Sequence, residues 1–445
     1  MAQKRHLFSA NQVFVLGFLS TIFIGALLLM LPFSQAKPVV WIDALFTSAS
    51  ATCVTGLATI DISTALTLWG KIIVLMLIQI GGLGIMTYSV FFTLLLKKEI
   101  QGKTSTQLQS LMDINDVNQL RAIVIAIIKY TAIIEIFGAT ILYNSSSLQH
   151  FGMLKRMFYA VFHSISAFCN AGFGLFSDNL AGIQSPLFLL CICLLIILGG
   201  LGFEVHFDLK SFNILKPIKS IKKLNVHSRI VLTVTFWLLV VGTGLVFFLE
   251  YFGALAGFSL GNKLLHSFFL SVSSRTAGFN TLSIGMLHLP TIFMLFIFMY
   301  IGASPGSTGG GIKTSTFGIL WLKVRQILLM KKDVEAFGRK IPESNVTKAL
   351  AVLFLSLMIL SVFIFLLLIV DKEHSLHELI FEAISAFGTV GLSTGITPML
   401  NEHAKLIIIL LMLVGRVGPL TLAYSLTRKQ KQIKYSLPEE KVLVG

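Results

Sequence analysis

Four short stretches of the sequence repeat one pattern of residues suited to binding a cation through the backbone. They read SATCVTGL, SAFCNAGF, VSSRTAGF and SAFGTVGL, and their glycines are Gly56, Gly172, Gly278 and Gly391. The loops offer no carboxylate, so the polar groups that all copies share are backbone carbonyls. Rings of carbonyl oxygens replace the hydration shell of K⁺ in pores, and glycine permits the dihedral angles that turn carbonyls toward one axis. The pattern therefore predicts a cation filter.

The predicted filter consists of the glycine and the two residues before it in each copy. These residues are Val54, Thr55, Gly56, Asn170, Ala171, Gly172, Thr276, Ala277, Gly278, Thr389, Val390 and Gly391. For a single copy the alternative is a glycine that merely ends a helix as a C-cap. Recurrence in four copies favours the filter, and a phenylalanine precedes each glycine at the same spacing: Phe46, Phe162, Phe268 and Phe381.

Apolar stretches that are too short to cross a bilayer come before each glycine, at 41–52, 154–168, 261–274 and 374–387. Their length fits a re-entrant helix better than a full span. Such a helix would point the negative end of its dipole at the centre, which also favours a cation. Backbone that is not helical at membrane depth persists only where it is buried or lines water.

The composition indicates an integral membrane protein. The 445 residues are 55% hydrophobic and 12% charged, with a mean hydropathy of +0.86, which excludes an ordinary soluble globule. We expect eight spanning helices, at about 12–31, 70–96, 121–143, 186–209, 228–250, 290–328 (interrupted), 347–370 and 404–426. An even number places both termini on the same side.

The net charge of +15 would suit nucleic acid if it formed one basic surface. Most basic residues instead fall at the termini and in alternate loops, around 97–121, 210–229 and 323–348. This is the positive-inside bias, so we expect a multi-pass protein of the cell membrane, surrounded by lipid, with both termini cytoplasmic and no nucleic-acid partner. The alternative use of such a basic face is to bind lipid or an acidic partner.

The repeat divides the chain into units of a helix, a short pore helix, an extended loop and a second helix. We expect pore repeats at 1–100, 101–210, 211–330 and 331–445, the last one ending in a cytoplasmic tail. The expected fold is an all-α membrane protein with a pseudo-fourfold central pore.

The stretch IGASPGSTGGGIKTSTFG, at 301–318, must interrupt the hydrophobic segment at 290–328 because glycine and proline break helices. A phosphate-binding loop would need Ser or Thr directly after Gly-Lys, whereas Ile312 separates Gly311 from Lys313. A simple kink is one alternative. We favour a mobile gate, since flexible backbone at membrane depth needs a cavity to line.

These motifs, from TCVTGL at 52–57 to GRVGPLT at 415–421, resemble the Trk/Ktr/HKT superfamily of K⁺ transporters over essentially the whole chain, most closely the membrane subunits of Ktr systems. In that family a glycine in all four loops accompanies K⁺ selectivity, and serine in the first loop accompanies Na⁺ permeation. Gly56 therefore favours K⁺ as the transported ion, held by the filter backbone only, with Na⁺ as a further candidate. The resemblance also places an intramembrane gate at 302–315.

The predicted gate also includes a charged residue in the last spanning helix, Arg416. A buried charge is costly, so it is expected to face the pore as an electrostatic barrier, as an arginine of this helix does in the family. The alternative is a structural arginine paired with a buried carboxylate or carbonyls. The predicted gate residues are Gly302, Ala303, Ser304, Pro305, Gly306, Ser307, Thr308, Gly309, Gly310, Gly311, Lys313 and Arg416.

The loops of this chain are too short to hold a sensing domain, so any nucleotide sensing must come from another polypeptide. The resemblance implies a homodimer and a cytoplasmic ring of nucleotide-binding RCK-domain subunits (KtrA-like). No cofactor is expected within the chain. Catalysis is not expected either, because Ser164 and Ser166, beside His163, form no GxSxG elbow, and no zinc-spaced His/Glu pair lies near them. The alternative function is a secondary transporter of another small solute with broken helices.

Overall fold

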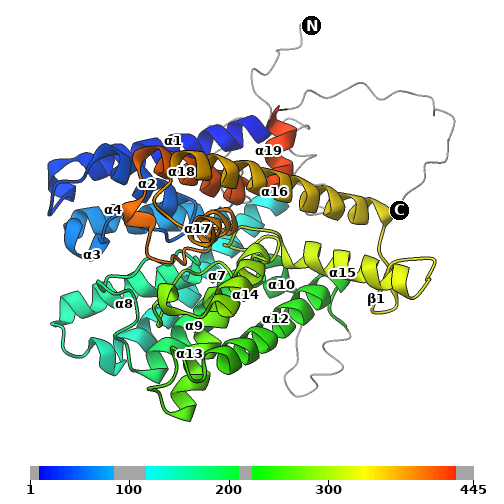
Figure 1. The fold of residues 1–445 in the computed structure, drawn as a ribbon, viewed down its shortest axis with the longest axis horizontal. Coiled ribbons are helices and arrows are strands. Elements are labelled where there is room, and N and C mark those ends of the chain that lie inside the picture. The colour runs from blue at the N-terminus through cyan, green and yellow to red at the C-terminus, as the bar shows by residue number, and fades with distance from the viewer. Residues whose placement is uncertain (1–9, 85–116, 210–222, 427–445) are drawn as a thin grey trace, which may run out of the picture.

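Helices make up nearly all of the regular structure in the computed structural model, which describes residues 10–84, 117–209 and 223–426 (Figure 1). The expected second half of the span at 70–96, the loop after it and the C-terminal tail from 427 lie outside these residues. The described strands, β1 (Glu335–Ala336) and β2 (Arg339–Lys340), form a small antiparallel hairpin. The predicted helical class is confirmed for the described residues, apart from this hairpin.

In each unit of the described chain, a long helix is followed by a shorter one. The α-helices are α1 (Ala10–Met30), α2 (Trp41–Thr52), α3 (Ile62–Ala65), α4 (Leu68–Gly82), α7 (Val117–Tyr143), α8 (Met153–Phe168), α9 (Pro186–Leu201), α10 (Phe203–Leu209), α12 (Val226–Glu250), α13 (Leu260–Ser273), α14 (Leu289–Tyr300), α15 (Thr314–Leu328), α16 (Glu343–Val370), α17 (Leu376–Gly388), α18 (Glu402–Val417) and α19 (Pro419–Leu426). Single 3₁₀ turns lie at η1 (Pro32–Ser34), η2 (Ser146–Leu148), η3 (Ile284–Met286) and η4 (Thr397–Met399).

Each short helix packs against the outer helix of its own unit and the inner helix of another unit, among other contacts. The first is the outer helix that precedes it in the chain, so that α1 contacts α2, α7 contacts α8, α12 contacts α13 and α16 contacts α17. The second is the inner helix of another unit, so that α8 contacts α4, α13 contacts α9, α17 contacts α14 and α2 contacts α18. The last contact brings the first and last units side by side, as Figure 1 shows in blue and orange. The contacts therefore close a ring.

Small residues allow the outer and short helices to approach closely. In three units a serine of the short helix donates a hydrogen bond to a carbonyl of the outer helix, beside a glycine that leaves room for it. The pairs are Ser48 with Gly25, Ser164 with Gly138, and Ser271 with Gly242. Small residues and hydroxyl donors of this kind are typical of helix contacts inside membranes.

Hydrogen bonds from side chains fix where three of the inner helices begin. The side chains of Thr67, Ser185 and Asn401 accept from the backbone N–H groups of Gly70, Phe188 and Ala404 at the first turns of α4, α9 and α18. These N-caps satisfy donors that would otherwise remain unpaired. The loop before each inner helix is therefore held in a defined path.

The eight spans expected from the sequence are not reproduced as eight continuous helices. Among the described residues, three helices are long and apolar enough to cross a membrane by themselves: 124–143 of α7, α12 and α16. The pair α9 and α10 reaches that length together but bends by 99°, and 15–30 of α1, α4 and α14 are shorter apolar helices. Breaks within the segments account for much of this difference.

Two of these breaks were not expected. The segments at 186–209 and 404–426 were predicted as single helices, but they are interrupted at Gly202 and Gly418, both with φ 88°. Positive φ ends a right-handed helix, and Pro419 then starts the next one. The break expected in the third unit is present, because α14 ends at Tyr300 and α15 begins at Thr314.

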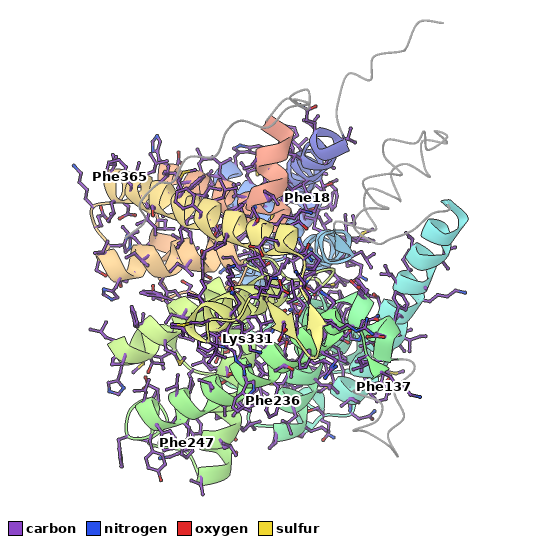
Figure 2. The ribbon with its side chains drawn as sticks, turned by 90° about the vertical axis from the view of Figure 1, so that its right-hand side faces the viewer. Phe18, Phe137, Phe236, Phe247, Lys331 and Phe365 are labelled. Carbon is purple, nitrogen blue, oxygen red and sulfur yellow. The ribbon has the colours of Figure 1, made fainter. Side chains whose placement is uncertain are left out.

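Large apolar side chains are exposed around the rim of the molecule. Phe137, Phe236 and Phe365 are 61%, 59% and 64% exposed. Figure 2 shows Phe365 and Phe137 on opposite sides of the view, with Phe236 between them. So much exposed apolar surface is unusual for a soluble monomer and suits a surface that faces lipid tails.

Candidate ion pathway

The four predicted filter loops begin where the short helices end, and nearly all of their residues are buried. The helices α2, α8, α13 and α17 end at Thr52, Phe168, Ser273 and Gly388, just before the loops. The residues two and one before each glycine are 0% exposed in all four loops. The structure thus puts the predicted residues inside the protein, at the carboxyl ends of the short helices.

The four loops share one backbone conformation. The residue two before each glycine has positive φ: 56° at Val54, 59° at Asn170, 76° at Thr276 and 48° at Thr389. The glycines have positive φ as well, at 96°, 70°, 74° and 90° in chain order. Positive φ is costly for β-branched residues, and its recurrence at a defined place points to function. The sequence pattern predicts the glycines but not this strained residue before them.

The glycines pack against one another in a closed cycle. A Cβ added to Gly56 would lie 2.6 Å from the carbonyl oxygen of Ala171 and 3.0 Å from the Cα of Gly172. A Cβ added to Gly172 would likewise meet Ala277 and Gly278. One added to Gly278 would meet Val390 and Gly391, and one added to Gly391 would meet Thr55 and Gly56. The four loops therefore meet, and the carbonyl before each glycine lies against the glycine of the preceding loop of the cycle.

A serine in each short helix secures the loop that follows. In the first and fourth loops, Gly56 N–H donates to Ser50 Oγ at 3.0 Å and Gly391 N–H to Ser385 Oγ at 3.1 Å. In the second loop, Ser166 Oγ donates to the carbonyl of Phe173 at 2.8 Å, and Ser273 bonds Phe279 in the same way in the third loop. These serines stand in the quoted motifs, but no role was predicted for them from the sequence.

The third copy differs from the other three by one residue. Phe46, Phe162 and Phe381 are 0% exposed, and their counterpart in the third copy is Phe269, also 0% exposed. Phe268, which the sequence analysis aligned with them, is only partly buried. The assignment of Phe268 is therefore wrong by one position, because the third copy reaches its glycine with one residue fewer.

The predicted gate segment forms a compact loop across the break between α14 and α15. Its ends are joined, since Gly302 N–H donates to the Ile312 carbonyl at 2.8 Å. Its middle is bonded to the broken inner helix of the second unit: Ser304 N–H donates to Gly200 O at 3.0 Å, and Thr308 N–H donates to Gly199 O at 3.3 Å. The loop is thus an ordered element attached to another unit, which a simple kink would not require.

The same loop also touches the filter loops. Thr308 Oγ1 donates to the carbonyl of Phe168 at 3.2 Å, directly before the second filter loop. Gly310 N–H donates to Thr389 Oγ1, in the fourth filter loop, at 2.9 Å. The segment therefore lies against the ends of the short helices, next to the place where the filter loops meet.

Arg416 is buried, with 4% exposure, and its guanidinium bridges two units. It donates to the carbonyls of Thr308, in the gate segment, and of Gly81, near the end of α4. No carboxylate lies within ion-pair distance of it in the described part of the chain. A second cation, Lys313, donates to the carbonyl of Gly309 at 2.6 Å. Two positive charges therefore hold the gate segment through backbone oxygens.

A buried carboxylate behind the fourth loop was missed by the sequence analysis. Glu382, in α17, is 1% exposed and accepts hydrogen bonds from Ser393 Oγ at 2.5 Å, Thr394 N–H at 3.2 Å and Thr397 Oγ1 at 2.9 Å. These residues follow Gly391, so Glu382 fixes the chain as it leaves the filter loop. An isolated glutamate in an apolar helix gives no signal of this partnership before the fold is known.

An ion pair joins the first and fourth units at the starts of their helices. Lys405 Nζ lies 2.8 Å from Asp43 Oδ1, and the side chains of both are mostly buried. Asp43 is in the first turn of α2 and Lys405 is near the start of α18. The pair helps to close the ring of units.

The chain is similar to known proteins over nearly its whole length. A family model described as TrkH, cation transport protein, matches residues 3–436. The chain is 41% identical to the Ktr system potassium uptake protein B of Bacillus subtilis, over 98% of this chain and 97% of that protein. It is 37% identical to the potassium/sodium uptake protein NtpJ of Enterococcus hirae, over 98% and 97% of the two chains.

A solved structure shares the fold. The crystal structure of the potassium transporter TrkH from Vibrio parahaemolyticus superposes with a TM-score of 0.73, over 96% of this chain and 87% of that one, at 20% sequence identity. At this identity the likeness establishes the fold alone.

Proposed function

This chain belongs to the TrkH family of cation transport proteins, and we propose that it carries K⁺ across the cell membrane as the ion-translocating subunit of a regulated uptake system. As a member of a transport family it is a transporter and not an enzyme. The proposal of K⁺ is supported by the relatives, which are named for potassium uptake, one of them for potassium and sodium.

We propose that the four converging loops are the selectivity filter. The observation that carries this proposal is the cycle in which each glycine packs against the carbonyl and the glycine of the next loop. Four carbonyls arranged around one centre would replace the water around a dehydrated cation. Glycine, with no side chain, leaves that centre open, and its presence as Gly56 in the first loop favours K⁺ over Na⁺.

The finer architecture follows from the same ring. Four units, each with an outer helix, a short helix, a filter loop and an inner helix, would surround one pore with pseudo-fourfold symmetry. Eight passages would then cross the membrane, several of them broken, with both termini cytoplasmic. The contacts of each short helix with the inner helix of a neighbouring unit support this arrangement.

We propose that the segment 302–315 and Arg416 form the gate. The loop lies against three of the filter-bearing units, and the guanidinium of Arg416 ties it to α4. A positive charge on the permeation path would raise the energy of a passing cation. Conduction would require the loop to leave its carbonyl and hydroxyl partners.

The partners proposed are a second copy of the chain and a cytoplasmic ring of nucleotide-binding RCK-domain subunits. The support for the ring is the name of the Bacillus relatives, each of which is part of a Ktr system. Na⁺ would act either as a coupled ion or as an activator.

Uptake of ⁸⁶Rb⁺ by the purified chain in liposomes tests the function. Uptake should be inhibited by external K⁺ far more strongly than by Na⁺, and amino acids and sugars should have no effect. Inhibition by an organic solute, or uptake equal to that of empty liposomes with and without a cytoplasmic partner, would favour a carrier for another solute instead.

A further inference from the structure

Two filter threonines touch the gate segment through their side chains. Thr389 Oγ1 accepts a hydrogen bond from Gly310 N–H at 2.9 Å. A Cβ on Gly310 would lie 2.5 Å from the same oxygen, and a Cβ on Gly309 would collide with Thr276 Oγ1. All four residues are buried. The two adjacent glycines of the gate therefore fit closely against the hydroxyls of the third and fourth filter loops.

Both threonines stand at the strained position of their loops. Their φ angles are 76° and 48°, and each is two residues before a glycine of the ring. A β-branched residue keeps such a conformation only when its surroundings hold it there. The N–H of Gly310 supplies a holding contact for Thr389, whereas the hydroxyl of Thr276 lies 3.0 Å from the side-chain amide of Asn170 in the neighbouring filter loop.

We propose that the Thr389 hydroxyl couples the gate to the filter. The hydrogen bond from Gly310 holds the gate segment closed and at the same time holds the fourth filter loop in its conformation. Opening of the gate breaks this bond, so a change in the gate segment alters the support of the fourth filter loop through one side chain. The inference rests on the proposed function, and it adds a positioning residue that links the two parts of the pathway.

Removing the Thr389 hydroxyl should destabilise the closed state more than the open state. In the closed state Gly310 N–H would be buried without an acceptor, whereas in the open state water could bond it. The net worth of one neutral hydrogen bond corresponds to a shift of about 3- to 10-fold in the equilibrium between the two states. The shift should favour the open segment.

The test uses a substitution on each side of the contact. Thr389→Val keeps the branching at Cβ and the volume, so it leaves the backbone strain unchanged. Gly310→Ala presses on the same hydroxyl from the gate side. Thr47→Val is the matched control, since the Thr47 hydroxyl is buried in α2 without a hydrogen-bond partner among the described residues.

The readout is the rate at which a thiol reagent modifies the cysteine introduced by Ser307→Cys, measured beside ⁸⁶Rb⁺ flux in liposomes. Ser307 lies in the gate segment and is partly exposed, whereas Cys53, Cys169, Cys191 and Cys193 are buried. Thr389→Val and Gly310→Ala should each raise modification and flux about 3- to 10-fold. Thr47→Val should change neither, and Thr389→Val should add nothing to the ⁸⁶Rb⁺ flux of a chain whose gate segment has been shortened.

Equal modification rates in folded Thr389→Val, Gly310→Ala and Thr47→Val proteins would overturn the coupling. Gly310→Ala decides the question if Thr389→Val does not yield a monodisperse protein. The labelling does not depend on ion flux, so the two proposals fail separately. A wild-type chain that carries no Rb⁺ would contradict the transport function. The labelling rates would still test the contact between Thr389 and Gly310.

Discussion

The filter glycines should not tolerate a side chain, and the contacts around each glycine predict which substitution is the most harmful. At Gly391 a Cβ would collide with the carbonyl oxygen of Thr55 and lie 2.9 Å from the Cα of Gly56. At Gly172 it would lie 2.8 Å from the carbonyl oxygen of Ala277 and 3.0 Å from the Cα of Gly278. All of these are backbone atoms of the ring, which cannot yield as the end of a flexible side chain would. We therefore expect Gly391→Ser to be the most harmful and Gly172→Ser the least.

The size of the effect follows from strain and contact together. A side chain at positive φ costs about 1–3 kcal/mol, and the backbone collision adds to it. Since about 1.4 kcal/mol corresponds to a factor of ten, distortion of this size should reduce the preference for K⁺ over Na⁺ at least about tenfold. Gly278→Ser and Gly56→Ser should fall between the two extremes, because their first contacts are at 2.5 Å and 2.6 Å.

The assay is ⁸⁶Rb⁺ uptake into liposomes, competed by K⁺ or Na⁺, for each variant. Gly257→Ser is the control, because a Cβ at Gly257 meets nothing within 4 Å and its φ is not positive. Monodisperse elution in detergent shows that each variant has folded. Unchanged selectivity in all four filter variants, or a ranking in which Gly172→Ser is the most harmful, would refute the reasoning.

Three further predictions concern the gate and the support behind the filter. Deleting several residues between Ala303 and Gly311 should raise Rb⁺ flux and weaken its dependence on a cytoplasmic partner; flux that stays at wild-type level and fully regulated would mean that the segment is only a kink. Arg416→Ser should also raise flux, with little loss of thermal stability in detergent because the partners of Arg416 are carbonyls; a large loss of stability without added flux would favour a structural arginine. Glu382→Ala should lower both the melting temperature and K⁺ selectivity, because three donors lose their acceptor, whereas Glu382→Gln keeps an acceptor oxygen and should do less harm; equal effects would contradict this role.

The sequence was sufficient to locate the backbone segments of the proposed pathway. Only glycine fits where four loops approach one centre, so Gly56, Gly172, Gly278 and Gly391 stand out without a structure. The break after Tyr300 was equally readable, because many glycines and a proline occur together at 301–313. Helical content followed from composition.

Other features depend on contacts that a sequence does not display. Hydropathy averaged over a segment hides the single glycines that break helices, as at Gly202 and Gly418. A loop shorter by one residue moved the buried aromatic of the third copy to Phe269. The partners of Arg416 are carbonyls distant in the chain, and every residue has a carbonyl, so no residue type points to them.

The most direct test of the central claim is to locate the bound ion. Crystals of the protein grown in Rb⁺, measured at the rubidium absorption edge, would show where the ion sits. The account predicts an anomalous peak at the centre of the ring, among the carbonyl oxygens of Thr55, Ala171, Ala277 and Val390. Ordered filter loops with no peak at that centre, or with Rb⁺ bound only at carboxylates elsewhere, would contradict it.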